Sequence, residues 1–223
     1  MSSRSRWLIS VAIVLLAVAC SGAQSPLQEA VASLETARSY QVEYELITFF
    51  EGTAKPVVAA GKIEFEAPAR WHISQDSIEM IAVGPTIYIE DAEGWRAEEM
   101  MELPVHPLLY LKAATDARRS RDSEGSRIFA FTVDRAKYRQ SFERVLGVVP
   151  PELDRVIARF RGSGEVTLDG RGRTENLRLH LQDASIPGKT RQELEIRLLD
   201  SAEDPSARAY AGAGRLQRGG EGL

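Results

Sequence analysis

The chain has 223 residues, with 28 lysines and arginines against 32 aspartates and glutamates, and a formal net charge of −4. This acidity argues against nucleic acid as a partner, because nucleic-acid binding demands a basic face. Cys20 is the only cysteine, which excludes an internal disulfide and, with three scattered histidines, argues against a structural zinc site.

The first 19 residues have the pattern of a secretory signal peptide. Arg4 and Arg6 precede an apolar run over 7–19 that only Ser10 interrupts. A basic start, roughly 7–15 apolar residues and a small-residue end are typical of such signals, whereas a membrane span needs about 20 apolar residues. We therefore expect 1–19 to be removed, which leaves the mature chain more acidic.

The junction Leu16-Ala17-Val18-Ala19-Cys20 resembles the lipobox of bacterial lipoproteins, in which the cysteine is diacylated before cleavage. The usual leucine lies one place early. Two acyl chains give stable anchoring, whereas one chain binds only marginally. The alternative is an ordinary signal peptide cut after Ala19, which would leave a free thiol in an oxidising compartment. We expect Cys20 to receive the lipid, with 20–26 as the lipidated cysteine and tether.

The acylated cysteine would hold the protein on the extracytoplasmic face of the cell membrane, or on an outer membrane if the cell has two. The membrane is then a partner through Cys20. No other segment approaches membrane-spanning length.

A helix and then a series of strands are predicted after the tether. Pro26 opens the helix, with Leu27, Val31 and Leu34 at spacings of three and four, and it should end near Arg38. Apolar and polar residues then alternate, which is the period of a strand with one wet face. The predicted strands lie at 41–46, 62–66, 71–74, 78–83, 87–89 and 95–96, as in a meander.

The second half contains three further helices and four strands by the same criteria. Leucines without alternation after Pro107 predict a helix over 107–117, and a charged hairpin follows at 118–127. The remaining predicted elements are a strand at 129–133, amphipathic helices at 135–146 and 151–160, and strands at 165–169, 177–181 and 194–198. The stretch 201–223 has hardly any apolar bulk and is predicted to be disordered.

These patterns amount to about ten strands, nearly all with one apolar face, against about four short helices. A layered domain must cover that face. An antiparallel sheet curled over a few helices can fill its core completely or leave an apolar cavity between sheet and helices. Pattern alone leaves both outcomes open.

The order of several short motifs resembles a known family, the LppX/LprG lipoproteins of mycobacteria and related bacteria, itself similar to the carrier LolA and the sensor RseB. The resemblance covers roughly Leu27 to Leu199. The motifs are Gly61-Lys62-Ile63-Glu64-Phe65 before Pro68-Ala69-Arg70-Trp71, Ile87-Tyr88-Ile89 leading to Gly94-Trp95, His106-Pro107-Leu108-Leu109, and a late Gly164-Glu165-Val166-Thr167-Leu168-Asp169 hairpin.

The resemblance implies an α+β fold over 27–200, in which a curved antiparallel β half-barrel wraps over a few α-helices. It also implies an apolar cavity for the acyl chains of a lipid or lipoglycan, which the protein carries or presents in the cell envelope. The alternative within the same resemblance is an RseB-like envelope sensor that binds a protein partner.

Candidates for the cavity wall are apolar strand positions with charged or polar neighbours, together with apolar helix positions. Each is also a good core residue, and for any single one a place in a filled core is the favoured interpretation. The candidates are Val42, Tyr44, Leu46, Ile63, Phe65, Trp71, Ile73, Leu108, Leu111, Phe142 and Leu146.

The sequence offers no visible carrier of catalysis, so we expect no enzyme activity, catalytic residue, cofactor or metal. There is no Gly-x-Ser-x-Gly elbow, no Gly-rich loop ending in Lys-Ser or Lys-Thr, and no His-x-x-x-His spacing. The paired acids Glu98-Glu99, and Glu43 with Glu45, alternate with apolar residues or lie in loops, as solvated faces do.

Replacement of the predicted anchor residue tests the lipobox. Cys20→Ser removes the sulfur that would carry the lipid, so we expect the protein to move from the membrane fraction to the soluble extracytoplasmic fraction without losing lipid binding by the domain. Fractionation of cells and incorporation of labelled palmitate measure this. A Cys20→Ser chain that stays membrane-bound and labelled would contradict acylation at this residue.

Overall fold

The computed structural model describes residues 26–199 except 38, 68, 76–77, 92–93, 124 and 184–189. The predicted signal 1–19, the anchor Cys20, the tether up to residue 25 and the tail 201–223 lie outside the described residues.

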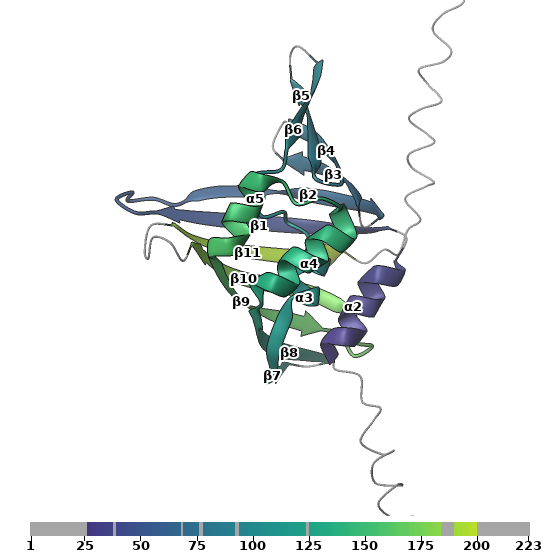
Figure 1. Ribbon diagram of the computed structural model, residues 1–223. Helices are drawn as coiled ribbons and strands as arrows, with labels where there is room; N and C mark the ends of the chain where they lie inside the picture. Colours follow the sequence, from purple (N-terminus) through teal and green to yellow (C-terminus); the bar gives the residue numbers. More distant parts are fainter. Residues whose placement is uncertain are drawn as a thin grey trace, which may run out of the picture.

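Four helices and eleven strands make up the described part of the chain (Figure 1). The helices are α2 (Pro26–Thr36), α3 (Pro107–Lys112), α4 (Arg135–Leu146) and α5 (Pro151–Arg159). The first six strands are β1 (Tyr40–Phe50), β2 (Val57–Ala67), β3 (Arg70–Gln75), β4 (Ile78–Val83), β5 (Thr86–Asp91) and β6 (Gly94–Glu99). The other five are β7 (Ala114–Ser123), β8 (Ser126–Val133), β9 (Phe160–Leu168), β10 (Thr174–Asp183) and β11 (Thr190–Leu199).

All eleven strands form one antiparallel sheet in the order β6-β5-β4-β3-β2-β1-β11-β10-β9-β8-β7. The sheet is curved and unclosed, with β6 and β7 as its two edges, and the helices lie on one of its faces (Figure 1). The predicted fold class, an α+β half-barrel over a few helices, is confirmed.

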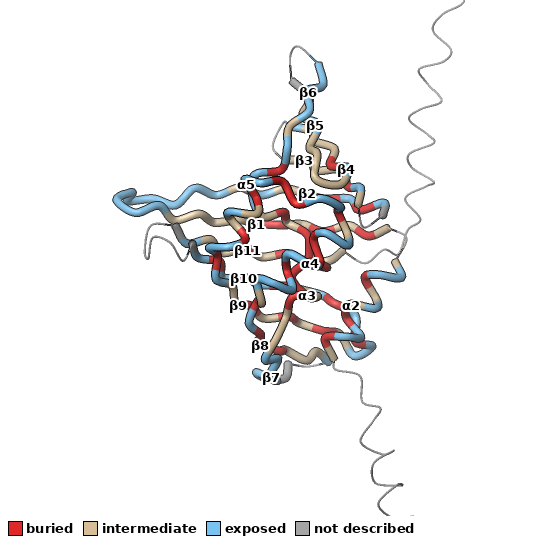
Figure 2. The backbone as a smooth tube through the Cα atoms, viewed as in Figure 1, coloured by how far each residue is buried: buried red, intermediate tan, exposed pale blue. Residues whose placement is uncertain are grey.

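The alternation in the sequence decides which face of each strand meets the helices. In β1, Tyr40, Val42 and Tyr44 are buried, whereas Glu43 and Glu45 point to the other face. Val42 pairs with Ile63 on β2, so the apolar face continues into the next strand. Figure 2 shows the resulting core, with buried segments concentrated where helices and sheet meet.

The helices begin and end at residues that suit those positions. The Asp134 side chain accepts a hydrogen bond from the Lys137 backbone N–H at 2.9 Å and caps α4. Pro151 stands at the first position of α5, where a missing N–H costs nothing. Along the chain of helices, α3 contacts both α2 and α4, and α4 contacts α5. No helix within the described ranges is long and apolar enough to cross a membrane.

The predicted helix over 107–117 is wrong in its second half. Helix α3 ends at Lys112, and Ala114 already belongs to β7, where it pairs with Val133 of β8. The small residues Ala113 and Ala114 have no helical or strand period of their own. Pairing with β8, which is distant in the sequence, therefore decides the conformation of these two residues. The predicted charged hairpin at 118–127 is the β7–β8 hairpin, and its first strand begins four residues earlier than predicted.

The turn between β4 and β5 lies directly against the end of α4. Gly84 has φ +57°, and a Cβ atom there would approach the Leu146 carbonyl oxygen to 2.8 Å. The Gly84 N–H donates to the Ala69 carbonyl at 2.7 Å, and the Met100 N–H donates to the Pro85 carbonyl at 2.9 Å. These contacts fix the β4–β5 hairpin beside the helix layer.

A pair of glycine substitutions tests the close packing of the sheet. A Cβ atom on Gly164 of β9 would lie 2.6 Å from the Arg178 carbonyl oxygen and 2.9 Å from Phe131 Cζ, whereas one on Gly170 would lie 3.6 Å from its nearest neighbour. We expect Gly164→Ala to lower the free energy of unfolding by about 1–3 kcal/mol, as overpacking does. Gly170→Ala should change it by less than about 0.5 kcal/mol. Urea denaturation of the two variants measures both values, and equal stabilities would contradict the packing described.

Candidate functional site

The eleven residues predicted to line a cavity come together on the two sides of one core. The strand residues all lie on the face that the helices cover, and the helix residues come from α3 and α4. Nine of the eleven are buried, and Leu46 and Ile73 are half-buried. Their proximity is thus a feature of the structure. Their role as walls of a ligand cavity remains a prediction.

The apolar face of the sheet extends beyond the helices along β3, β4 and β5. Directly paired residues form a row across four strands: Ile63 pairs with Ile73, Ile73 with Met80, and Met80 with Ile89. Ile63 is 1% exposed, whereas the next three members of the row are half-buried. The row therefore leads from the closed core to a partly open surface.

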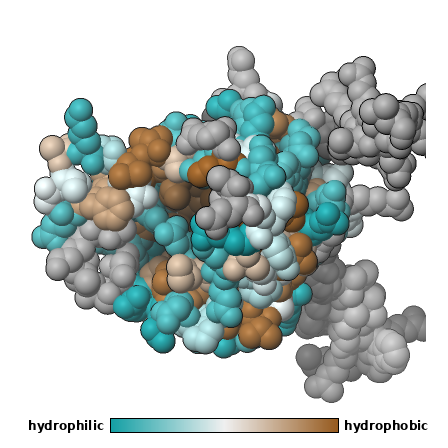
Figure 3. Space-filling view, turned by 90° about the horizontal axis from the view of Figure 1, so that it is seen from above, coloured by the Kyte–Doolittle hydropathy of each residue, from teal (hydrophilic) through white to brown (hydrophobic). Residues whose placement is uncertain are grey.

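A second row runs parallel to the first. Phe65 pairs with Trp71, Trp71 with Ala82, and Ala82 with Ile87, and burial again decreases outward, since Ile87 is half-buried. We call the four half-buried members of the two rows the open strip. The open strip consists of Ile73, Met80, Ile87 and Ile89. Figure 3, seen from the end where β5 and β6 project, shows patches of apolar side chains among polar ones.

Sequence reasoning identified only Ile73 of the open strip. In 78–83 the residues Met80, Ile81, Ala82 and Val83 are all apolar, so the segment has no period of two that would separate its faces. The pairing of Met80 with Ile73 and Ile89 supplies that information. The predicted wet face of β3 is correct, because His72 is half-exposed and lies 2.6 Å from Glu79.

An aromatic cluster closes the core beneath the helices. His106, the residue before α3, is fully buried, with its ring 4.7 Å from the Phe65 ring and 5.3 Å from the Trp71 ring. Phe65 also stacks on Tyr40, with ring centroids 4.5 Å apart and planes inclined by 22°. Large rigid rings therefore occupy the space where β1, β2 and β3 meet the loop before α3.

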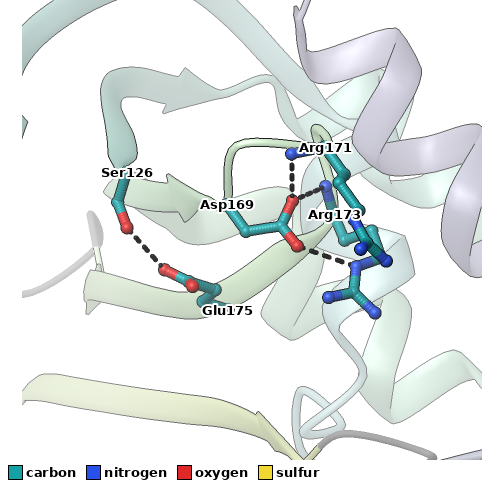
Figure 4. A network of polar contacts seen from close by, with 5 residues as sticks. All are labelled: Ser126, Asp169, Arg171, Arg173 and Glu175. Atoms are coloured by element: carbon teal, nitrogen blue, oxygen red, sulfur yellow. Dashed lines mark hydrogen bonds and ion pairs between the residues drawn. The ribbon is translucent and has the colours of Figure 1, made fainter. Parts of the chain in front are cut away.

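A polar network stabilises the loop between β9 and β10 (Figure 4). The Asp169 carboxylate accepts hydrogen bonds from the backbone N–H groups of Arg171 and Arg173, both at 2.8 Å, and from Arg173 Nε at 2.7 Å. Burial raises the pKa of Asp169, but these hydrogen bonds and the Arg173 charge outweigh burial and hold the pKa below its ordinary value of 3.8. Glu175, on the next strand, accepts a hydrogen bond from the Ser126 hydroxyl at 3.0 Å.

Hollows at two places in the described part of the molecule bear on the predicted cavity residues. One, of about 390 Å³, lies between α2 and the adjoining ends of β1, β10 and β11. The other, of about 750 Å³, lies between β7, α4 and α5. None of the eleven predicted cavity residues lines either of them. Over the described ranges, no three histidines, cysteines or acids are grouped as metal ligands.

Comparison with known proteins gives likenesses in fold. No family model matches the chain, and no curated protein matches it. The lipoprotein LppX of Mycobacterium tuberculosis aligns at 8% identity and a TM-score of 0.43, covering 80% of this chain and 95% of that one. LprF of Mycobacterium bovis aligns at 11% identity and a TM-score of 0.41, covering 80% of this chain and 92% of that one. A LolA superfamily protein of Nitrosomonas europaea aligns at 9% identity and a TM-score of 0.40, covering 80% of this chain and 94% of that one. LppX and a LolA superfamily protein, both named in the resemblance above, are thus among the solved structures that align with this chain.

The Asp169 network predicts a loss of stability in acid. Its folded pKa lies below the unfolded value, so the stabilisation is present above the unfolded pKa and is lost as the pH falls through the folded pKa. Asp169→Asn should lower the free energy of unfolding at pH 7 by about 1–2 kcal/mol and reduce the decline below about pH 4. Urea denaturation between pH 2 and pH 7 measures this.

Glu152→Gln on the exposed face of α5 is the matched control, since Glu152 contacts only Arg155 in the described interactions. It should leave the acid decline as in the wild type. An Asp169→Asn variant as stable as the wild type at pH 7 would show that the network does not stabilise the fold.

Proposed function

We propose that the protein is a membrane-anchored, extracytoplasmic lipoprotein that binds the acyl chains of a lipid or lipoglycan and carries or presents it in the cell envelope. The acyl chain lies along the open strip and continues toward the predicted residues Leu46 and Ile63. The observation that carries this proposal is the pair of apolar rows that lead from the closed core into a half-exposed surface.

The dimensions and energetics of the open strip suit an acyl chain. Adjacent strands are about 4.8 Å apart, so the rows from β2 to β5 span about 14 Å. Each methylene group removed from water contributes about 0.8 kcal/mol, and burial of about ten contributes on the order of 8 kcal/mol. Binding of this kind needs no cofactor and no source of chemical energy.

The rim of the same sheet face adds further apolar surface. Ile78 of β4 is 45% exposed, and Phe50 and Val57, at the end of the β1–β2 hairpin, are 45% and 58% exposed. Exposed apolar side chains on one face are typical of surfaces that a ligand or membrane covers. The proposed cell-envelope location and the anchor on Cys20 would bring the protein close to lipids.

A charge placed on the open strip tests the proposal. Met80 and Ile81 are neighbours on β4, both half-buried, but they lie on opposite faces of the sheet. Met80→Asp puts a carboxylate in the path of the acyl chain, whose burial would be costly, whereas Ile81→Asp puts the same charge on the other face. We expect Met80→Asp to reduce binding of dioleoylglycerol at least tenfold and Ile81→Asp to leave it within about twofold.

Native mass spectrometry of the full chain, released from tetraethylene glycol octyl ether micelles with added dioleoylglycerol, measures the bound fraction. Thermal denaturation of both variants verifies that they are folded. A wild-type chain that binds no dioleoylglycerol, or equal losses in the two variants, would overturn the proposal. A stoichiometric protein in place of lipid would favour the envelope-sensor alternative.

A further inference from the structure

The smaller of the two hollows is a second candidate site, separate from the open strip. We call it the α2 hollow, the space of about 390 Å³ between the last turns of α2, the start of β1 and β10, and the end of β11. Tyr40 and Thr174 line it from two different strands. Its volume is within the range of small-molecule sites.

Two buried hydroxyl groups at the α2 hollow lack a hydrogen-bond partner among the described residues. They belong to Tyr40, which is 8% exposed, and Thr174, which is 6% exposed. A buried hydroxyl without a partner costs about 1–3 kcal/mol. Native proteins seldom retain such a cost unless something else supplies the partner.

The surrounding structure holds the Tyr40 hydroxyl in place. The Tyr40 ring stacks on Phe65, which is itself packed against Trp71 and His106. Burial raises the pKa of Tyr40 far above its ordinary value of 10, so the phenol remains a neutral O–H group that can both donate and accept. Thr174 Oγ1 offers the same two capacities.

The charges around the α2 hollow disfavour an ionic occupant. Arg173 and Arg197 balance Asp169 and Glu175, so the formal charge of the lining is zero. The carboxylates are engaged within the protein, since Asp169 binds Arg171 and Arg173 and Glu175 binds Ser126. An anion would meet two carboxylates, and a cation would meet two guanidinium groups.

Apolar side chains also line the α2 hollow. Leu34 belongs to the last turn of α2, Ala37 follows the helix, and Leu198 comes from the inner face of β11. An occupant therefore needs one face of C–H groups and an edge that both donates and accepts hydrogen bonds. Sugar rings and cyclic polyols have this distribution.

We propose that the α2 hollow binds a neutral, hydroxyl-rich group, such as a sugar ring or another polyol, through the hydroxyls of Tyr40 and Thr174. The group can come from a free sugar or from the headgroup of a glycolipid. If the group is a free sugar, the proposal does not depend on acyl-chain binding by the open strip. If the group is a glycolipid headgroup, the proposal rests on the proposed function.

Saturation-transfer difference NMR on the full chain in detergent micelles tests the site with methyl β-D-glucoside, methyl α-D-mannoside and myo-inositol as probes. We expect at least one probe to bind and Tyr40→Phe and Thr174→Val each to weaken it about tenfold. Tyr110→Phe is the matched control, because Tyr110 is a fully buried tyrosine that does not line the hollow. It should leave probe binding unchanged.

Thermal denaturation provides a second readout. Tyr40→Phe removes a hydroxyl that has no hydrogen-bond partner among the described residues, so without a probe the variant should be at least as stable as the wild type while binding the probe less well. A merely structural Tyr40 would give the opposite result, a destabilised protein with unchanged probe binding. Such a result would overturn the proposal.

A pair of lipids distinguishes the two sources of the group. Monoglucosyl-dioleoylglycerol and dioleoylglycerol share their acyl chains and differ by one sugar. Preferential retention of the glucosyl lipid in native mass spectrometry, lost in Tyr40→Phe, supports the headgroup source, and binding of methyl glycosides alone supports the free sugar. Absence of all sugar-dependent binding, or displacement of the probes by inorganic phosphate as the tighter ligand, would overturn the proposal even if dioleoylglycerol binds the open strip.

Discussion

The apolar face of a wide sheet is larger than the helices that lie on it. The four helices together run about 57 Å at 1.5 Å per residue and are about 10 Å across, so they shield roughly 600 Å² of sheet. The eleven strands, at 3.3 Å per residue and 4.8 Å apart, present on the order of 1,500 Å². Curvature reduces this difference without removing it. Part of the uncovered area is polar, as on the edge strands β6 and β7, and its apolar part is either exposed or covered by something outside the described chain.

The position of the uncovered surface follows from the connections. The central strands β1, β11, β10 and β9 lie under the helix layer and contain fully buried residues such as Val42 and Ile196. Strands β3 to β6 continue past the helices, and the close contact between Gly84 and the Leu146 carbonyl holds the β4–β5 turn against α4. The open strip is therefore held beside the closed core, which makes one continuous apolar path.

Local sequence patterns were sufficient for elements whose period is strong. The helix at Arg135–Leu146 begins and ends where predicted, because an amphipathic stripe marks it. The strand at Ile78–Val83 has no period of two, but flanking turn residues mark its ends, and it too begins and ends where predicted. The predicted end of the helix at residue 117 is wrong, because Ala113 and Ala114 carry no pattern of either period. Pairing with β8 decides their conformation. The fold class came from the family resemblance carried by the order of several short motifs, with the count of one-faced strands against helices beside it, and neither needs an exact boundary.

The candidate sites were less predictable, because they depend on which residues meet across strands. Alternation with charged neighbours identified Ile73, but Met80 and Ile89 became members of the strip only through their pairing. Nothing local marks Thr174 as a neighbour of Tyr40. Their proximity arises because β11 lies between β1 and β10 and the three strands end beside α2. The signal, Cys20 and the tail lie outside the described residues and stay predictions.

The dense packing beneath the helices decides where an acyl chain can lie at least cost. Phe65, Trp71 and Phe142 are buried in one core. An acyl chain placed among them must displace side chains or lift α3 and α4. Lifting a helix exposes its buried face, at about 25 cal/mol for each Å² of apolar surface. The open strip carries no such cost, because its residues are already half-exposed. A ligand that covered the strip would bury apolar surface that the helices leave exposed. In the proposed function, the core residues predicted as cavity walls would form the closed end of its path.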